Sequence, residues 1–223
     1  MKRTKLKERE LPNYTKGEEI MNMVSHIVGG AIGITSLVLC LIFSAKHHNS
    51  YGIAGSIVFG ISMILLYTIS SVYHGLRKGT AKKVMQVIDH CTIFILIAGT
   101  YTPVLLCSVR SYNSALAWSL FGIIWFFAAL GITLNAIDLK KYKIFSMACY
   151  LLMGWCIIFT APKLTPILGK GGMLLLIFGG ISYTVGAILY MIGAKKHYFH
   201  FVFHIFVDIG SLLHFLCILL YVI

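Results

Sequence analysis

The chain alternates between long apolar stretches and short polar segments. Seven apolar stretches of roughly 20 residues stand out, and a helix of that length crosses about 30 Å of hydrocarbon. The pattern therefore predicts an all-α membrane protein, a bundle of seven transmembrane helices that follows a short basic leader. The predicted leader is 1–23, the predicted membrane domain is 24–223, and the predicted spans are about 24–45, 51–73, 84–107, 114–134, 144–162, 172–193 and 201–223.

The composition agrees with this interpretation. Hydrophobic residues make up 58% of the 223 positions, more than in an ordinary soluble domain. The segments between the apolar stretches are short, so we expect neighbouring helices to pack antiparallel, with no separate soluble domain. Pro103 and Pro162 are expected to kink or end their helices, because proline lacks the backbone N–H that a helix needs.

A net charge of +12 is typical of nucleic-acid-binding proteins, but here Lys and Arg lie between the spans rather than along one helix face. Six lie in the leader, and nine lie in the connections that follow the second, fourth and sixth spans. The other side of the membrane holds only Lys46, Arg110, Lys163 and Lys170. The positive-inside rule therefore predicts a cytoplasmic N-terminus and an outer C-terminus. The expected partners are membrane lipids, with no nucleic acid.

Four polar side chains occur where the hydrophobic pattern predicts membrane. His74 closes the second span, Asp89 opens the third, and His200 and His204 open the seventh. The topology, which was derived from Lys and Arg alone, puts all four on the cytoplasmic side. Polar residues at membrane depth are costly and usually serve a site. Their agreement on one side therefore predicts a functional site there.

The spacing of the histidines indicates a metal site. His200 and His204 are four residues apart, so they share one helix face, with His204 about 6 Å deeper. Two imidazoles at that spacing form a common metal clamp, and His74 would supply the third ligand. Three neutral imidazoles leave one position for water, as in catalytic zinc sites, where the pKa of that water falls to about 7. The sequence thus predicts Zn²⁺ bound by His74, His200 and His204.

Asp89 and Ser70 are the predicted catalytic residues. Asp89 is placed to orient a histidine, to accept the proton of the water, or to hold that water directly. Ser70 lies four residues before His74, so its hydroxyl would bond an oxyanion or the Asp89 carboxylate. A site just beneath the cytoplasmic headgroups suits a lipid amide or ester that enters from the side.

A structural role is the alternative for each of these histidines, which would then bond neighbouring helices or reach the interface. We favour that role for His26, His90 and His214. Asp208, Ser211 and His214 continue the face of the last two predicted ligands, which predicts a polar stripe that points into the bundle. The sequence leaves the roles of His26, His90, Asp208 and His214 open. The residues expected to be solvated in loops are His47, His48, His197 and Asp138.

Several of these residues occur in short motifs: Ser70-x3-His74, Asp89-His90 followed by Ile97-Ala-Gly-Thr-Tyr-Thr-Pro103, Met153-Gly-Trp155, His200-x3-His204 and Gly210-Ser211. From about Glu18 to the end, the chain resembles the hemolysin III family. That family is the bacterial branch of the progestin and adipoQ receptor superfamily, related to the alkaline ceramidases. The resemblance implies a seven-helix bundle in a bacterial plasma membrane, with zinc on the three histidines and Asp89 and Ser70 beside it. Asp208 departs from the pattern, because an apolar residue is expected there.

The residues and the resemblance favour a zinc-dependent hydrolase of a lipid amide or ester, a ceramidase-like amidase. The second hypothesis is a receptor-like regulator of membrane lipid or energy homeostasis, in which zinc is structural. The third is a pore-forming cytolysin, as the family name suggests. A chain that is permanently embedded and lacks a secretion signal argues against the third. Neither the substrate nor the oligomeric state is predicted.

Overall fold

Long helices account for nearly all of the protein. The computed structural model describes residues 4–193 and 196–223, and these residues contain helices and connections but no strand. The long helices are α1 (Lys16–Lys46), α2 (Ser50–Gly75), α3 (Thr80–Pro103), α5 (Ser114–Asp138), α6 (Lys143–Trp155), α7 (Ala161–Ile192) and α8 (Phe199–Cys217). The short ones are η1 (Leu6–Glu8), η2 (Val104–Val109), α4 (Arg110–Tyr112), η3 (Cys156–Thr160) and η4 (Ile218–Val222).

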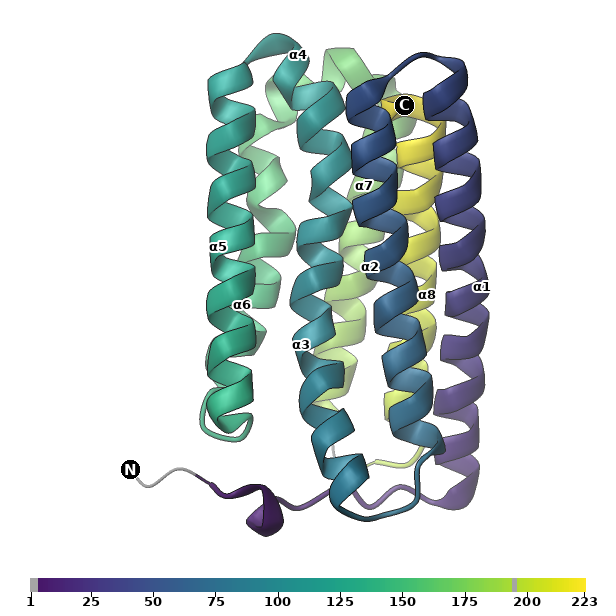
Figure 1. Ribbon diagram of the computed structural model, residues 1–223, viewed down its shortest axis with the longest axis vertical. Helices are drawn as coiled ribbons and strands as arrows, with labels where there is room; N and C mark the ends of the chain where they lie inside the picture. The colour runs from purple at the N-terminus through teal and green to yellow at the C-terminus, as the bar shows by residue number, and fades with distance from the viewer. Residues whose placement is uncertain (1–3, 194–195) are drawn as a thin grey trace.

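The long helices lie side by side along one common direction and form an up-down bundle (Figure 1). The connections α2–α3, α5–α6 and α7–α8 lie at one end, together with the N-terminal segment. The C-terminus lies at the opposite end (Figure 1). Helices α1, α2 and α8 are neighbours on one side of the bundle, and α5 and α6 lie on the other side. The predicted antiparallel packing is confirmed, because short connections leave adjacent helices no other arrangement.

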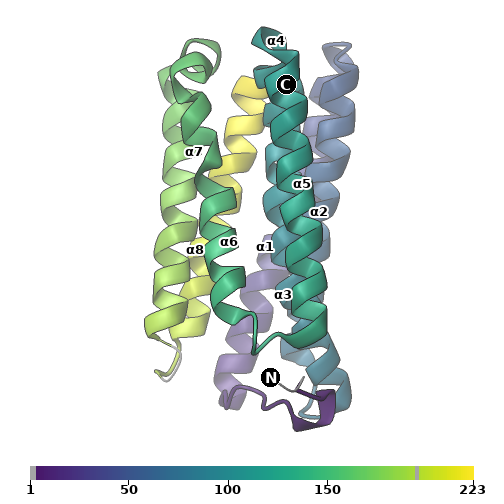
Figure 2. The same ribbon diagram turned by 90° about the vertical axis from the view of Figure 1, so that its left-hand side faces the viewer.

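Six helices among the described residues are long and apolar enough to cross a membrane. One of them, Lys143–Ile192, is a continuous helical run of 50 residues, which would extend about 75 Å if it were straight. It is not straight, because Gly169 has a φ of 64° and a ψ of 176°. The chain rises through α6, turns near this glycine and descends through the rest of α7 (Figure 2). Glycine adopts this left-handed φ without the clash that a Cβ would cause.

Several predicted helix boundaries shift in the structure. Helix α1 begins at Lys16, ahead of the predicted start at residue 24, because Thr15 and Glu18 form a reciprocal capping box there. Pro162 was expected to kink or end the fifth span, but it lies in the first turn of α7. That position tolerates proline, since the first-turn N–H groups have no helical partner. Pro103 ends α3, and the π-helix η2 follows it.

The polarity of the bundle is the reverse of a soluble protein. Helix α1 exposes large apolar side chains such as Ile27, Val28 and Ile34, and it buries Ser36 and Ser44. This arrangement suits a lipid environment, where apolar side chains face acyl chains and polar groups bond one another inside. The packed core between the helices contains Phe59, Met63, Tyr67, Phe94, Leu164 and Leu168.

Asp138 is not the solvated loop charge that the sequence suggested. It is the last residue of α5, it is only 1% exposed, and its carboxylate accepts hydrogen bonds from three backbone N–H groups. The backbone nitrogens of Lys140 and Lys141 lie 3.1 and 3.2 Å from Oδ1 of Asp138. The backbone nitrogen of Thr4 lies 2.7 Å from its Oδ2. The N-terminal segment is held further by Lys83, whose Nζ donates to the Lys7 carbonyl at 2.7 Å. Residues 4–15 thus lie across one end of the bundle (Figure 2).

Candidate metal centre

The three predicted histidine ligands come together at the end of the bundle where the N-terminal segment lies. His74 is near the end of α2, and His200 and His204 are in the first two turns of α8. One ring nitrogen from each lies within 4.8 Å of the other two. His74 and His204 are 2% and 1% exposed, and His200 is half-buried. Within the described residues this is a group that can hold a metal ion.

Helix α8 presents both of its histidines because its start is fixed against α1. Tyr198, just before the helix, has a φ of 63°, and its N–H donates to Oε1 of Glu18 at 2.8 Å. The helical spacing then puts His200 and His204 on one face, with ring centroids 4.5 Å apart. The ring of His74 is 5.2 Å from each of them. The two helices thus meet through their imidazoles.

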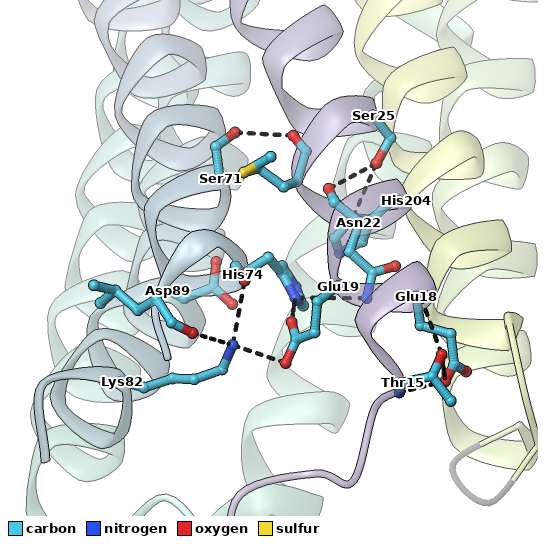
Figure 3. A network of polar contacts seen from close by, with 12 residues as sticks. Thr15, Glu18, Glu19, Asn22, Ser25, Ser71, His74, Lys82, Asp89 and His204 are labelled. Atoms are coloured by element: carbon cyan, nitrogen blue, oxygen red, sulfur yellow. Dashed lines mark hydrogen bonds and ion pairs between the residues drawn. The ribbon is translucent and has the colours of Figure 1, made fainter. Parts of the chain in front are cut away.

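Glu19 on α1 orients His74. Its Oε2 is 2.7 Å from Nδ1 of His74, and its Oε1 is 2.7 Å from Nζ of Lys82 (Figure 3). A carboxylate beside Nδ1 favours the tautomer with the proton on Nδ1, which leaves the lone pair on Nε2. Nε2 of His74 is buried and has no hydrogen-bond partner among the described residues. The free nitrogen is therefore the one available to a metal.

The backbone of α1 orients His204 in the same way. Nδ1 of His204 is 3.2 Å from the carbonyl oxygen of Asn22 and 3.2 Å from Oγ of Ser25 (Figure 3). Because a carbonyl only accepts, Nδ1 carries the proton and Nε2 is the lone-pair nitrogen. Outer partners of this kind fix the ring and raise the basicity of metal-ligating histidines.

His200 is the least constrained of the three histidines. Both of its ring nitrogens are buried and lack a hydrogen-bond partner in the part of the chain that the structure describes. Its ring stacks on Tyr14 at 5.1 Å between centroids and an interplanar angle of 29°, and it also contacts Tyr190 at 5.6 Å. Burial raises the pKa of the Tyr14 phenol above its usual range. Tyr14 is therefore a neutral ring that covers the cluster from the N-terminal segment.

The residues fit a zinc ion on two counts. Buried nitrogens without partners are costly, and binding a metal would satisfy Nε2 of His74 and one of the two ring nitrogens of His200. A tetrahedral zinc with Zn–N distances of about 2.0–2.1 Å holds its nitrogen ligands about 3.4 Å apart. Since the three ligand atoms are already within 4.8 Å of one another, small side-chain rotations bring them to that separation.

Asp89 and Ser70 lie at the same end of the bundle, on α3 and α2. Ser70 is 1% exposed, and its hydroxyl lies near the Asp89 carboxyl group. The Asp89 side chain is 14% exposed and lies 3.8 Å from Nδ1 of His90. Ser70 was expected to bond either a substrate oxyanion or this carboxylate, and the catalytic roles of both residues stay predictions. Helix α3 packs along the helix that carries His74.

The remaining histidines differ from one another. His214 bonds a neighbouring helix as expected, because its Nε2 donates to the Leu176 carbonyl on α7 at 3.1 Å. His90 bonds within its own helix, to the Gln86 carbonyl at 2.9 Å. His26 stacks on His204 with ring centroids 3.6 Å apart, and neither of its ring nitrogens has a partner among the described residues. The neighbour-helix hydrogen bond predicted for His26 is thus not seen there.

Two residues of the site were missed by the sequence reasoning. Glu19 falls within the predicted leader, and Lys82 was counted among the cations of the connection that follows the second span. Lys82 is 2% exposed, and its Nζ bonds Glu19 and the carbonyls of His74 and Leu76. An acid inside the first helix was the available signal. Its partner lies 55 residues away in sequence, so no local pattern identified it.

Known proteins resemble this chain over most of its length. Residues 14–215 match the family model described as haemolysin-III related. Hemolysin-3 of Bacillus cereus is 38% identical over 205 residues, which is 92% of both chains. A hemolysin-3 homolog of Bacillus subtilis (strain 168) is 38% identical over 93% of this chain and 96% of its own. The human monocyte to macrophage differentiation factor is 25% identical over 72% of this chain and 67% of its own. The extent of these matches, which includes every residue of the histidine cluster, shows that the chain belongs to the haemolysin-III-related family.

Proposed function

We propose that the protein crosses the bacterial plasma membrane seven times, with its N-terminus in the cytoplasm and its C-terminus outside. Two features support seven crossings rather than six. The parts of the 50-residue run before and after Gly169 are each long enough to cross. The termini lie at opposite ends of the bundle (Figure 1), which requires an odd number. The excess of Lys and Arg at the end with the N-terminus sets the orientation.

Reporter fusions test this topology. A reporter that is active only outside the cytoplasm should be active when it follows Ile223 and inactive when it follows Lys141. Activity at both sites, or at neither, would contradict it.

We further propose that His74, His200 and His204 hold a zinc ion and that the protein is a zinc-dependent hydrolase of a lipid amide or ester. The observation that carries this proposal is the cluster itself, in which three histidine nitrogens converge, and those of His74 and His200 have no hydrogen-bond partner in the described part of the protein. When bound, zinc supplies a Lewis acid and makes water a usable nucleophile at neutral pH. Three protein ligands leave a coordination position free for that chemistry.

Residues of the protein transfer the proton, stabilise the oxyanion and orient the histidine ligands. Asp89 accepts the proton of the attacking water and later returns it to the leaving amine or alcohol. Ser70, which lies near Asp89, helps to hold the carboxylate in place and donates to the oxyanion that forms on the substrate carbonyl. Glu19 and the Asn22 carbonyl keep the imidazoles of His74 and His204 turned toward the shared position.

The surroundings of the cluster favour a lipid substrate. The N-terminal segment lies across the end of the bundle, and Tyr14 stacks on His200. The outer faces of the helices are apolar, as Ile20 and Val24 on α1 show. A substrate that reaches His74 and His200 laterally from the bilayer avoids the covered end. A scissile bond close to a headgroup, as in an N-acyl or O-acyl lipid, matches the depth of the cluster.

Zinc content and turnover, measured together, test the hydrolase. Purified protein should contain about one zinc per chain and release fatty acid from N-acyl or O-acyl lipids in mixed micelles. His204→Ala should lose both zinc and turnover. Asp89→Asn should keep zinc and lose turnover by roughly 10²–10⁴-fold, the range for removal of a general acid or base. Full turnover in metal-free protein would rule out the mechanism.

A receptor-like regulator with structural zinc is the second candidate. It is favoured by the way the cluster joins α2 and α8, with ligand-orienting groups from α1. In that case His200→Ala should lower the melting temperature sharply, and Asp89→Asn should change neither zinc content nor stability. No lipid hydrolysis would then be found in the zinc-loaded wild type. The two sets of results separate the two functions.

A further inference from the structure

A second group of polar side chains lies deeper in the bundle than the histidine cluster. Asp208 follows His204 by one turn of α8, about 6 Å further along the helix. It is 9% exposed, and its Oδ1 is buried without a hydrogen-bond partner in the described part of the chain. An unpaired carboxylate inside a membrane protein is costly. The group must therefore carry a proton or meet a mobile cation.

Every helix packed against Asp208 contributes a neutral group. Gly29 on α1 is so close that a Cβ there would lie 2.7 Å from Oδ1 of Asp208. His26 lies one turn earlier on the same helix, beside Tyr67. The Tyr67 ring on α2 crowds Gly29 together with the Asp208 carboxyl group, and Tyr183 reaches in from α7. No ion pair to Asp208 occurs within residues 4–193 and 196–223.

Three hydroxyl groups form a continuous chain that begins beside this carboxyl group. The Tyr67 hydroxyl, whose ring lies beside Asp208 near Gly29, donates to Oγ of Ser211 at 2.6 Å. The Tyr183 hydroxyl lies 2.6 Å from the same Oγ. Each hydroxyl both donates and accepts, so protons can shift along the chain in either direction. Tyr67 and Ser211 are buried and Tyr183 is half-buried, in the interior between α2, α7 and α8.

The chain leads away from the histidine cluster. The Tyr183 ring is 5.4 Å from the ring of His214, whose Nδ1 is buried and without a partner among the described residues. From Asp208 to His214 the advance along α8 is about 9 Å. His214 also lines a cavity of about 130 Å³, together with Thr100 and Trp155. Ionisable and hydroxyl groups therefore extend from the metal end into the opposite half of the bundle.

We propose that Asp208 and the Tyr67–Ser211–Tyr183 chain form a proton relay, so that the protein conducts protons through the interior of its bundle. In one transfer, the Asp208 carboxyl group gives its proton to the Tyr67 oxygen as Tyr67 passes its own proton to Ser211. Ser211 passes its proton to Tyr183, and Tyr183 releases its proton toward His214. Each hydroxyl gains one proton and loses one, so only the charge of the two ends changes. The relay does not depend on hydrolysis at the metal centre.

A liposome assay tests the proposal. The zinc-loaded protein is reconstituted with a pH-sensitive dye inside the vesicles, and an acid jump is applied outside. Wild-type protein should admit protons faster than protein-free liposomes. Asp208→Asn and Tyr67→Phe should lower the rate to that of protein-free liposomes. Tyr150→Phe should retain the wild-type rate, because the Tyr150 hydroxyl donates to the His90 carbonyl on α3 and is not part of the Tyr67–Ser211–Tyr183 chain. Equal rates for wild type and Asp208→Asn would overturn the relay.

Two further measurements keep the test decisive. The flux is repeated with sodium replaced by choline, since an Asp208 site for sodium would make the rate depend on that ion. Such dependence would replace the proton relay with a cation site. Infrared spectra of the micellar protein should show a protonated carboxylic acid band that titrates with pH and is absent in Asp208→Asn. If both spectra show the same bands at every pH, Asp208 exchanges no proton and the relay is refuted, even if a variant reconstitutes poorly.

Discussion

Replacing Glu19 with Gln isolates the group that orients the first metal ligand. In the wild type the Glu19 carboxylate is 2.7 Å from both His74 Nδ1 and Lys82 Nζ. Gln keeps the shape of the side chain but removes its charge. Loss of an outer partner of a metal-ligating histidine typically weakens metal binding 10–100-fold, or about 1.4–2.7 kcal/mol. We expect a weakening in this range, measured by competition with a chromophoric zinc chelator in micelles.

The same substitution also affects stability, through a different group. Lys82 is 2% exposed, and without Glu19 its ammonium keeps hydrogen bonds to the His74 and Leu76 carbonyls and a contact with the Tyr73 ring. Breaking a buried ion pair from one side costs about 3–5 kcal/mol, and the two remaining hydrogen bonds put the expected loss near the lower value. The double variant Glu19→Gln/Lys82→Met should recover stability, because no buried charge is left. It should not recover zinc affinity, because His74 still lacks its carboxylate.

Glu18→Gln is the matched control. Glu18 is adjacent in sequence, but its carboxylate bonds the N–H groups of Thr15 and Tyr198 rather than a histidine of the cluster. This variant should bind zinc with nearly wild-type affinity, because the Gln amide oxygen can still accept the Tyr198 N–H that fixes the start of α8. Glu19 does not orient His74 as a metal ligand if Glu19→Gln binds zinc as tightly as the wild type. The same holds if the double variant Glu19→Gln/Lys82→Met recovers zinc affinity together with stability.

Three further results are expected. Gly131→Ala should destabilise the protein by about 1–3 kcal/mol in thermal unfolding, because its Cβ would lie 2.1 Å from the Phe94 ring. Gly122→Ala on the same helix meets nothing within 4 Å and should be neutral or stabilising. Equal effects of the two substitutions on stability would contradict the packing of Gly131 against Phe94. Asp138→Asn weakens the contact to the Thr4 N–H, so limited proteolysis of the N-terminal segment should be faster than in the wild type, and an unchanged cleavage rate would show that the contact is unimportant. Removing zinc with a chelator should lower the melting temperature by the equivalent of about 2.7 kcal/mol when zinc was present at 100 times its dissociation constant; an unchanged melting temperature would mean that no zinc is bound.

The local sequence was enough for much of the candidate site. The spacing of His200 and His204 fixes their common face on any helix, and the charge pattern assigned His74 to the same end. The same reasoning put Ser70 and Asp89 at this end, where their side chains lie near each other, and their catalytic roles stay predictions. The convergence of the three histidines was predictable because helical geometry and membrane depth depend on positions close together along the chain.

The partners of those residues could not be predicted in the same way. Glu19 and His74 are 55 positions apart, and Asp138 and Thr4 are 134 apart. Lys82 looked like any cytoplasmic cation, yet it is buried under the cluster. Such contacts depend on how the helices rotate and approach one another. No alternation of apolar and polar residues within one helix contains that information.

The sequence by itself determined that the protein is a bundle of membrane-length helices with imidazoles at one end, because hydrophobic length and helical period are local properties. Only the tertiary structure decided which nitrogens stay free, since Glu19 and the Asn22 carbonyl reach the histidines from a different helix. It also decided that Asp208 meets a chain of hydroxyls rather than acyl chains. In a lipid environment, apolar contact scarcely distinguishes one helix face from another. Which faces pack together is therefore decided by close approach at small residues such as Gly29 and by hydrogen bonds between helices.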